Sequence, residues 1–164
     1  MRTFILAAAL ALIPVSALAA DLSGTWVRDA ALSKPAPYPN YWLTRAAPGM
    51  GGNQNQIFVM RITQTAADVT VSDPLHNLRT LVLDGKPHVT RTDTGMADLT
   101  TTAALAGAGL TVTSVQPYGG MPGNVTMTAT ENWALSADGK HLTITTVRVL
   151  PATTQTHVEV FARQ

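Results

Sequence analysis

The fold is decided by residues 133–144, WALSADGKHLTI, because their hydrophobic alternation and their turn residues indicate the same strand register. Asp138-Gly139 is typical of a two-residue type I′ turn, since both central positions of that turn have φ > 0. Counting outward from this turn, Leu135 pairs with Leu142 and Trp133 with Ile144, so the large apolar side chains share one face. The stretch is therefore predicted to be a β-hairpin with one face in a core.

The rest of the chain is expected to supply further strands, because a single hairpin cannot bury such a face alone. From residue 56 onward, short alternating runs are separated by turn residues about every ten positions, with no helical period. A second turn pair, Asp84-Gly85, predicts another hairpin in which Leu81 faces His88. The pattern predicts an all-β protein, an antiparallel up-and-down β-barrel of about eight to ten strands, with a β-sandwich as the alternative.

Residues 1–19 have the pattern of a secretory signal peptide. Arg2 supplies positive charge, an apolar run extends from Phe4 to Ile13, and Ala17-Leu18-Ala19 matches a small-residue cleavage site. An apolar run of about ten residues is too short for a bilayer of roughly 30 Å, so stable membrane insertion is not expected. We expect cleavage near Ala19, an exported periplasmic or secreted protein, and one barrel domain over residues 20–164.

Charge and cysteine content exclude several classes of partner and site. The chain has 11 Lys+Arg and 10 Asp+Glu, and removing Arg2 with the leader leaves 10 of each. Without a basic run, nucleic acid is not an expected partner. The absence of cysteine excludes disulfides and thiolate metal sites. The histidines are dispersed without a carboxylate cluster, so no metal and no cofactor are expected.

A long irregular loop is predicted at residues 29–55, which contain many prolines and glycines. Tyr41 and Trp42 lie within it. Loops of this length are usually functional or disordered. Two interpretations stay open: a surface segment with a few residues tucked onto the core, or a lid whose aromatic side chains close over an opening in the sheet.

Three motifs carry a family resemblance: LSGTW at residues 22–26, ENWALSADGKHLTI at 131–144 and FAR at 161–163. With them the chain resembles secreted bacterial lipocalin-like proteins of the calycin type. The resemblance implies a barrel that holds an apolar or amphipathic small molecule, and a structural cation–π contact of Arg163 on Trp26. The chain lacks disulfides and a recognisable C-terminal helix, so the implied ligand role is an analogy of fold.

The register of the 133–144 hairpin also brings charged residues together. Glu131 faces Thr146, and Arg148 lies diagonally beyond on the same face, within reach of a long side chain. Glu131 and Arg148 are therefore in position to pair. If the face points into a barrel, such a desolvated pair is either structural or a recognition site.

The last strand allows two orientations. With Val158, Val160 and Ala162 inward, the interior is apolar and the protein is a simple binder. With His157 and Glu159 inward, a general acid or base sits in a dry environment that moves its pKa toward neutrality.

We predict a binding protein for a small apolar or aromatic molecule, rather than an enzyme. The predicted ligand contacts are apolar and aromatic side chains, Phe58, Met60, Val112, Met127 and Trp133, together with Tyr41 and Trp42 of the loop. One alternative is a cofactor-free isomerase, lyase or hydrolase using Glu131 or His157, with Arg148 orienting an anionic group. The other is an envelope protein-interaction module that docks through the aromatic loop.

Overall fold

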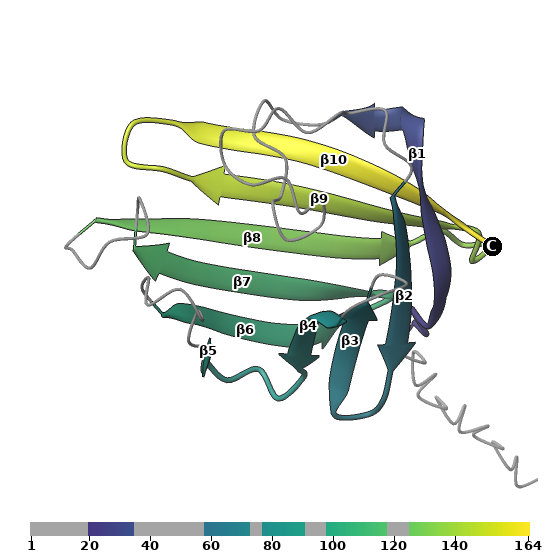
Figure 1. Cartoon of the computed structure of the whole chain (residues 1–164), viewed down its shortest axis with the longest axis horizontal. Helices are drawn as coiled ribbons and strands as arrows, with labels where there is room; N and C mark the ends of the chain where they lie inside the picture. Colours follow the sequence, from purple (N-terminus) through teal and green to yellow (C-terminus); the bar gives the residue numbers. More distant parts are fainter. Residues whose placement is uncertain (1–19, 35–57, 73–76, 91–97, 118–124) are drawn as a thin grey trace, which may run out of the picture.

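The computed structural model describes residues 20–34, 58–72, 77–90, 98–117 and 125–164, with backbone only at positions 77 and 78. These residues form ten antiparallel strands in one sheet and no helix (Figure 1). The strands are β1 (Gly24–Lys34), β2 (Val59–Gln64), β3 (Asp68–Ser72), β4 (Asn77–Val82), β5 (His88–Thr90), β6 (Leu99–Ala106), β7 (Gly109–Pro117), β8 (Thr126–Leu135), β9 (His141–Val149) and β10 (Thr154–Arg163). The predicted all-β, up-and-down barrel is confirmed.

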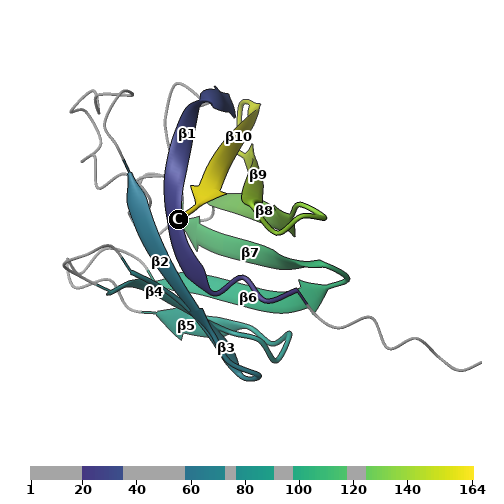
Figure 2. The same cartoon turned by 90° about the vertical axis from the view of Figure 1, so that its right-hand side faces the viewer.

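The first strand pairs with the last, which joins the two halves of the sheet. The strand order is β4-β3-β2-β1-β10-β9-β8-β7-β6-β5, so β1 lies between β2 and β10, and Trp26 is opposite Arg163. Figure 2 shows β1 to β4 on one side of the interior and β6 to β10 on the other. Among the described strands, β4 and β5 are not paired with each other. The barrel is therefore nearly closed, with one junction lacking strand pairing.

The hairpin of β8 and β9 has the predicted register, with Leu135 opposite Leu142 and Trp133 opposite Ile144. Its turn is different. The Gly139 N–H donates to the Ser136 carbonyl, and the Ser136 N–H donates to the His141 carbonyl. The two strands are therefore joined by a four-residue loop instead of the two-residue type I′ turn. The Asp138 carboxylate accepts the Ser136 hydroxyl and the Lys140 N–H, while Gly139 takes a φ of 69°. The predicted two-residue turn and the observed four-residue loop are centred on the same residues, Asp138 and Gly139, so the strand register is the same for both.

The hairpin predicted around Asp84-Gly85 is wrong. β4 pairs only with β3, and β5 pairs with β6, so Leu81 and His88 are not strand partners. The Asp84 carboxylate instead accepts the Lys86 N–H and contacts the His88 ring, and the Gly85 N–H donates to the Ala103 carbonyl on β6. These bonds direct the chain away from β4, and the unpaired junction of the barrel falls here.

The predicted loop at residues 29–55 begins too early, because β1 continues to Lys34. The pairing of β1 with β10 shifts between Asp29 and Lys34. Asp29 accepts the N–H groups of Ala31 and Leu32, and the Ser33 hydroxyl accepts the Val160 N–H. Side-chain hydrogen bonds thus carry the strand through an irregularity that its sequence pattern conceals. Residues 35–57, with the proposed lid, lie outside the described residues.

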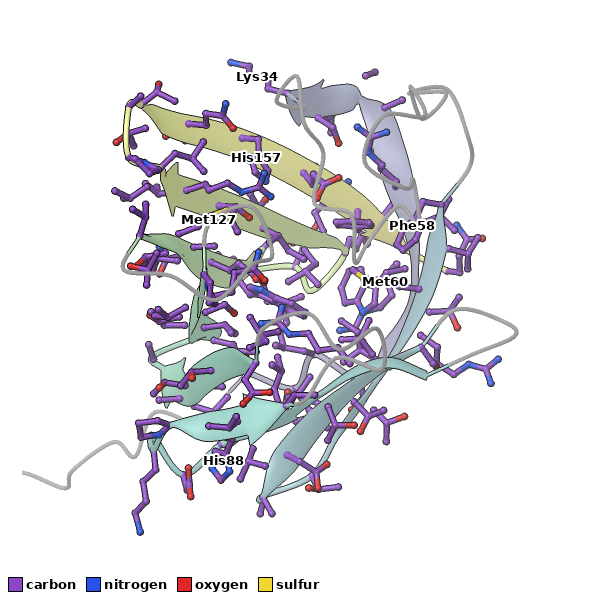
Figure 3. The ribbon with its side chains drawn as sticks, turned by 60° about the vertical axis from the view of Figure 1, so that its left-hand side comes forward. Lys34, Phe58, Met60, His88, Met127 and His157 are labelled. Carbon is purple, nitrogen blue, oxygen red and sulfur yellow. The ribbon has the colours of Figure 1, made fainter. Side chains whose placement is uncertain are left out.

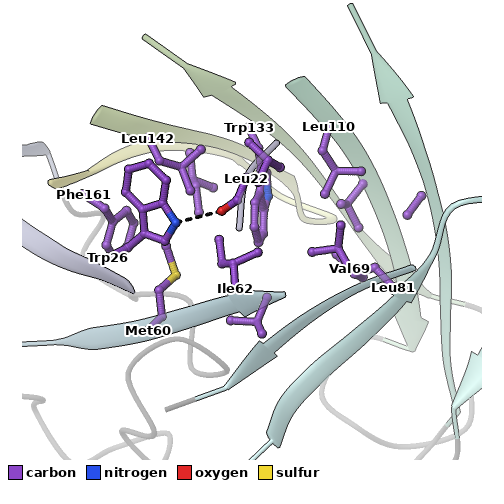
Figure 4. Packing of buried hydrophobic residues seen from close by; sticks show 14 residues of the cluster. Leu22, Trp26, Met60, Ile62, Val69, Leu81, Leu110, Trp133, Leu142 and Phe161 are labelled. Carbon is purple, nitrogen blue, oxygen red and sulfur yellow. Dashed lines mark hydrogen bonds between the residues drawn. The ribbon is translucent and has the colours of Figure 1, made fainter. Parts of the chain in front are cut away.

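The hydrophobic core fills one end of the barrel. Trp26 is fully buried beside Phe161 and Met60, and its indole N–H donates to the Leu22 carbonyl at 2.9 Å (Figure 4). The Arg163 guanidinium lies over the Trp26 ring, 4.6 Å from its centroid, which is the contact that the family resemblance implies. The cluster takes buried side chains from nearly all strands: Leu22, Trp26, Met60, Ile62, Val69, Val71, Leu81, Ala103, Leu110, Val112, Trp133, Leu142, Ile144 and Phe161.

A close backbone approach beside this core makes Gly109 sensitive to substitution. A Cβ at Gly109 would overlap the main-chain oxygen of Trp133, so Gly109→Ala forces β7 and β8 apart. We expect a loss of about 3 kcal/mol in the free energy of unfolding, measured by urea denaturation. The control is Gly107→Asn in the adjacent loop, where φ is 56° and no atom lies within 4 Å. Asparagine tolerates that conformation, and an equal loss in both variants would contradict the argument.

Candidate functional site

The barrel interior changes from apolar to charged along its strands. Along the buried face of β10, the apolar Phe161 is succeeded by Glu159 and then His157. Along the buried face of β8, Trp133 is succeeded by Glu131. The charged side chains come from five strands and form what we call the polar cluster: Arg28, Arg79, Glu131, Arg148, His157 and Glu159. Because charged groups are costly to bury, the members of this cluster require partners or shifted protonation.

Glu131 is held by several donors. Arg79 reaches from β4 to both carboxylate oxygens, with Nη1 at 2.9 Å and 3.1 Å, and its Nη2 contacts the Ser114 hydroxyl on β7. The Trp133 indole N–H donates to the same carboxylate at 3.0 Å. Arg79 thus connects the edge strand β4 to β7 and β8, across the junction where strand pairing is absent.

The ion pair that the structure describes for Glu131 is made by a residue that the sequence analysis did not single out, Arg79. Arg148 lies on the same face of the sheet and is buried, as the register indicates, but the ion pair of Glu131 is made by Arg79. Arg79 was missed because the Asp84-Gly85 hairpin was predicted to place its strand elsewhere. Its parity with the buried Leu81 was the signal that could have identified it as an inward side chain.

The last strand turns its polar residues inward. His157 and Glu159 are each 2% exposed, and Phe161 is fully buried, whereas Val158, Val160 and Ala162 lie on the other face of β10. The pairing of Trp26 with Arg163 sets this orientation, because it brings Phe161 beside the core and every second residue follows. Of the two orientations open from the sequence, the one with a titratable interior is present.

Glu159 occupies an environment that disfavours its charge. Its Oε1 lies 3.6 Å from Arg28 Nε, and its Oε2 is buried with no hydrogen-bond partner among the described residues. Burial raises the pKa of Glu159 from 4.5 to about 7, Arg28 lowers it in part, and the charge of Glu131 raises it further. This carboxyl group therefore changes its charge near neutral pH.

His157 is held in its neutral form. Both ring nitrogens are buried and lack a hydrogen-bond partner in the described part of the chain. Burial lowers the pKa of His157 from 6.5 to about 4, and the nearby charge of Arg148 lowers it as well. A neutral imidazole offers one donor and one acceptor, and both remain available here.

The predicted apolar ligand contacts are only partly placed near this cluster. Met60, Val112 and Trp133 belong to the packed core and have at most 2% of their surface exposed. Phe58 and Met127 are half-buried and retain accessible surface; Phe58 packs edge-on against Phe161, with 6.3 Å between ring centroids. Figure 3 shows Phe58 and Met60 on the same side of the interior, with Met127 and His157 opposite them. Tyr41 and Trp42 lie outside the described residues.

No group of three His, Cys, Asp or Glu residues in the described ranges has the arrangement of a metal site. No helix with the length and apolar character of a membrane span occurs in the same ranges.

Comparison with known proteins identifies the fold. No family model and no curated protein matches the sequence. Among solved structures, zebrafish ileal bile acid-binding protein, crystallised with cholic acid, is similar with a TM-score of 0.52 and 16% sequence identity. The match covers 87% of this chain and 98% of that chain. The protein has a calycin-type β-barrel fold, and at this identity the likeness shows the fold alone.

The two shifted pKa values predict opposing pH effects on stability. Between pH 4.5 and about 7 the folded state binds more protons at Glu159 than the unfolded state, so stability falls as pH rises. Between about pH 4 and 6.5 the unfolded state binds more protons at His157, so stability rises with pH. In the overlapping range the two contributions largely cancel in the wild type.

Single substitutions should separate these contributions. Glu159→Gln leaves the His157 effect, so its stability relative to wild type should increase by about 2 to 3 kcal/mol from pH 4.5 to 7. His157→Gln should show the opposite trend, losing stability relative to wild type from pH 4 to 6.5. Urea denaturation at four pH values measures both, with the exposed Asp98→Asn as control. Profiles parallel to the wild type in both variants would contradict the assigned shifts.

Removing Arg79 should expose the cost of the Glu131 charge. Arg79→Met leaves that carboxylate with the Trp133 N–H as its remaining donor from this network, and we expect a loss of about 3 to 5 kcal/mol in the free energy of unfolding. Arg79→Met combined with Glu131→Gln should recover part of it. Arg61→Met on the exposed face of β2 is the matched control. A loss as small as that of the control would show that the pair is not desolvated.

Proposed function

We propose that the protein is an exported binding protein for a small amphipathic molecule that carries an anionic group. The observation that carries this proposal is the polar cluster, where His157 and Glu159 present buried polar atoms without hydrogen-bond partners among the described residues. Buried polar groups in folded proteins are nearly always hydrogen-bonded. A ligand group that forms hydrogen bonds with these atoms therefore removes the cost of leaving them unsatisfied, which favours binding.

The charges of the cluster favour an anion. Three guanidinium groups, those of Arg28, Arg79 and Arg148, stand against the carboxyl groups of Glu131 and Glu159, and His157 is neutral. Among these six described side chains, the positive charges exceed the negative charges by one, or by two when Glu159 is protonated. In a buried setting, where screening by water and salt is weak, this excess attracts a carboxylate or sulfonate.

The remainder of the ligand is proposed to be apolar. Phe58 and Met127 keep accessible surface next to the interior, and aromatic and thioether side chains suit a flexible apolar guest. A polar site next to an apolar wall is the usual composition of a small-molecule site. The structural neighbour, which was crystallised with cholic acid, supports this proposal by its fold.

The site of action is proposed from the sequence. The leader-like residues 1–19, with small residues at 17–19, support export to the periplasm or secretion after cleavage near Ala19. A chain without cysteine is compatible with an oxidising compartment.

One observation keeps an enzymatic function as the second candidate. A carboxyl group with a pKa near 7 in a dry site is suited to general acid–base catalysis, and Glu159 has this property. It replaces Glu131 as the candidate base, because the carboxylate of Glu131 is already occupied by Arg79 and Trp133. Conversion of the ligand by purified protein, detected by mass spectrometry, would distinguish this function from binding.

Ligand binding can be tested with matched charged and uncharged probes. We expect cholate and palmitate to quench the fluorescence of Trp133, and their methyl esters to bind at least about tenfold more weakly because they lack the anionic group. Arg148→Met should weaken acid binding by about tenfold and leave ester binding unchanged. Arg61→Met is the control, and circular dichroism verifies the fold. Equal affinity for acid and ester, or no binding of any probe, would contradict the proposal.

A further inference from the structure

The chain contains two glutamates, Glu131 and Glu159, and both lie buried in the same interior at 2% exposure. They differ in their partners. Glu131 accepts hydrogen bonds from Arg79 at both oxygens and a third from Trp133. Glu159 has one guanidinium nitrogen at 3.6 Å, and its Oε2 has no hydrogen-bond partner within the described ranges. Their chemical roles must therefore differ.

We propose that Glu159 takes up a proton when an organic anion binds beside it, so that the protein binds the anion and a proton together. This inference rests on the proposed function and adds the chemical state in which the ligand is held. It assigns Glu159 as a recognition residue whose protonation selects for negatively charged ligands.

The groups packed around Glu159 explain why this carboxyl group is the one that changes. Arg28 on β1 favours its charge, Glu131 on β8 opposes it, and His157 on its own strand is neutral. Arg148 on β9 acts on His157, and the neighbouring core residue Ile144 offers no charge. Burial and the charge of Glu131 raise the pKa of Glu159. Arg28 offsets this only in part, because its Nε lies 3.6 Å from the carboxylate, which is longer than a hydrogen bond.

An anion that enters this arrangement adds a second negative neighbour. Repulsion between charges a few ångströms apart is strong where water is excluded, so the ionised carboxylate and the anion exclude each other. Protonation removes the repulsion and converts Glu159 from an acceptor into a donor for the anion. The neutral ring of His157 can supply a second donor from either nitrogen.

The proton is available at little cost. A carboxyl group whose pKa is about 7 is half protonated at neutral pH, so requiring the protonated form weakens binding by about a factor of two. An ordinary carboxyl group, with a pKa of 4.5, would weaken binding by roughly 300-fold under the same requirement. The burial of Glu159 therefore makes proton-coupled binding feasible at physiological pH.

The expected pH dependence has a definite sign. Below about pH 7 Glu159 is already protonated, so the affinity for an anion is independent of pH. Above it, each unit of pH should lower the affinity by up to about tenfold, because one proton must be taken up with each anion. A methyl ester lacks the charge and should show almost no dependence.

Isothermal titration calorimetry with cholate at pH 8 tests the proton directly. Titrations in phosphate and in Tris, which differ in ionisation enthalpy, should report uptake approaching one proton per cholate for the wild type. Glu159→Gln should reduce the uptake to near zero and make the affinity independent of pH between 6 and 9. The matched control, Asp98→Asn, removes an exposed carboxyl group and should behave as the wild type.

A second measurement does not depend on a variant that folds. Labelling with glutamate carrying ¹³C at its side-chain carboxyl carbon gives two signals, one for each glutamate. At pH 8, cholate should shift one of them to the position of a protonated carboxyl group. Cholate binding without proton uptake and without this shift would overturn the inference and leave the proposed function standing. Failure of cholate to bind would overturn both.

Discussion

The pairing of β1 with β10 is the constraint on which the rest of the structure depends. It joins the two ends of the chain at Trp26 and Arg163, where the guanidinium covers the indole ring and the indole N–H bonds the Leu22 carbonyl. Because strand residues alternate between faces, this register decides every inward position of β10. It directs Phe161 into the core. Glu159 and His157 lie on the same face of β10 and are therefore buried as well, although the burial of polar side chains does not by itself stabilise the fold.

The interior divides its charged groups according to local partners. Arg79 and Trp133 satisfy one glutamate, while the other faces a more distant cation and a negative neighbour. The two carboxyl groups have the same chemistry, yet one is a structural anchor and the other a titratable group. A buried ion pair contributes little net stability compared with apolar residues of similar size. The structural role of Arg79 is therefore to connect β4 to β7 and β8, at the junction where backbone pairing is missing.

Much of the fold could be predicted because its signals are local. The alternation of Trp133, Leu135, Leu142 and Ile144 gave the register of β8 and β9 even though the turn proved to have four loop residues. The prediction failed at Asp84-Gly85, where the same dipeptide ends one strand and leads to a different neighbour. Asp-Gly supplies a turn conformation, but the hydrogen bond from Gly85 to Ala103 decides the direction of the chain.

The sequence by itself determined the strand content, the register of the β8–β9 hairpin and the presence of charged residues on one face of these two strands, since these follow from side-chain alternation. Only the tertiary structure decided which cation meets Glu131, which face of β10 is buried and which carboxyl group titrates near neutrality. Those properties depend on residues far apart in the chain, 52 positions for Arg79 and Glu131. They arise when closure of the barrel removes water from charges that the sequence alone cannot bring together.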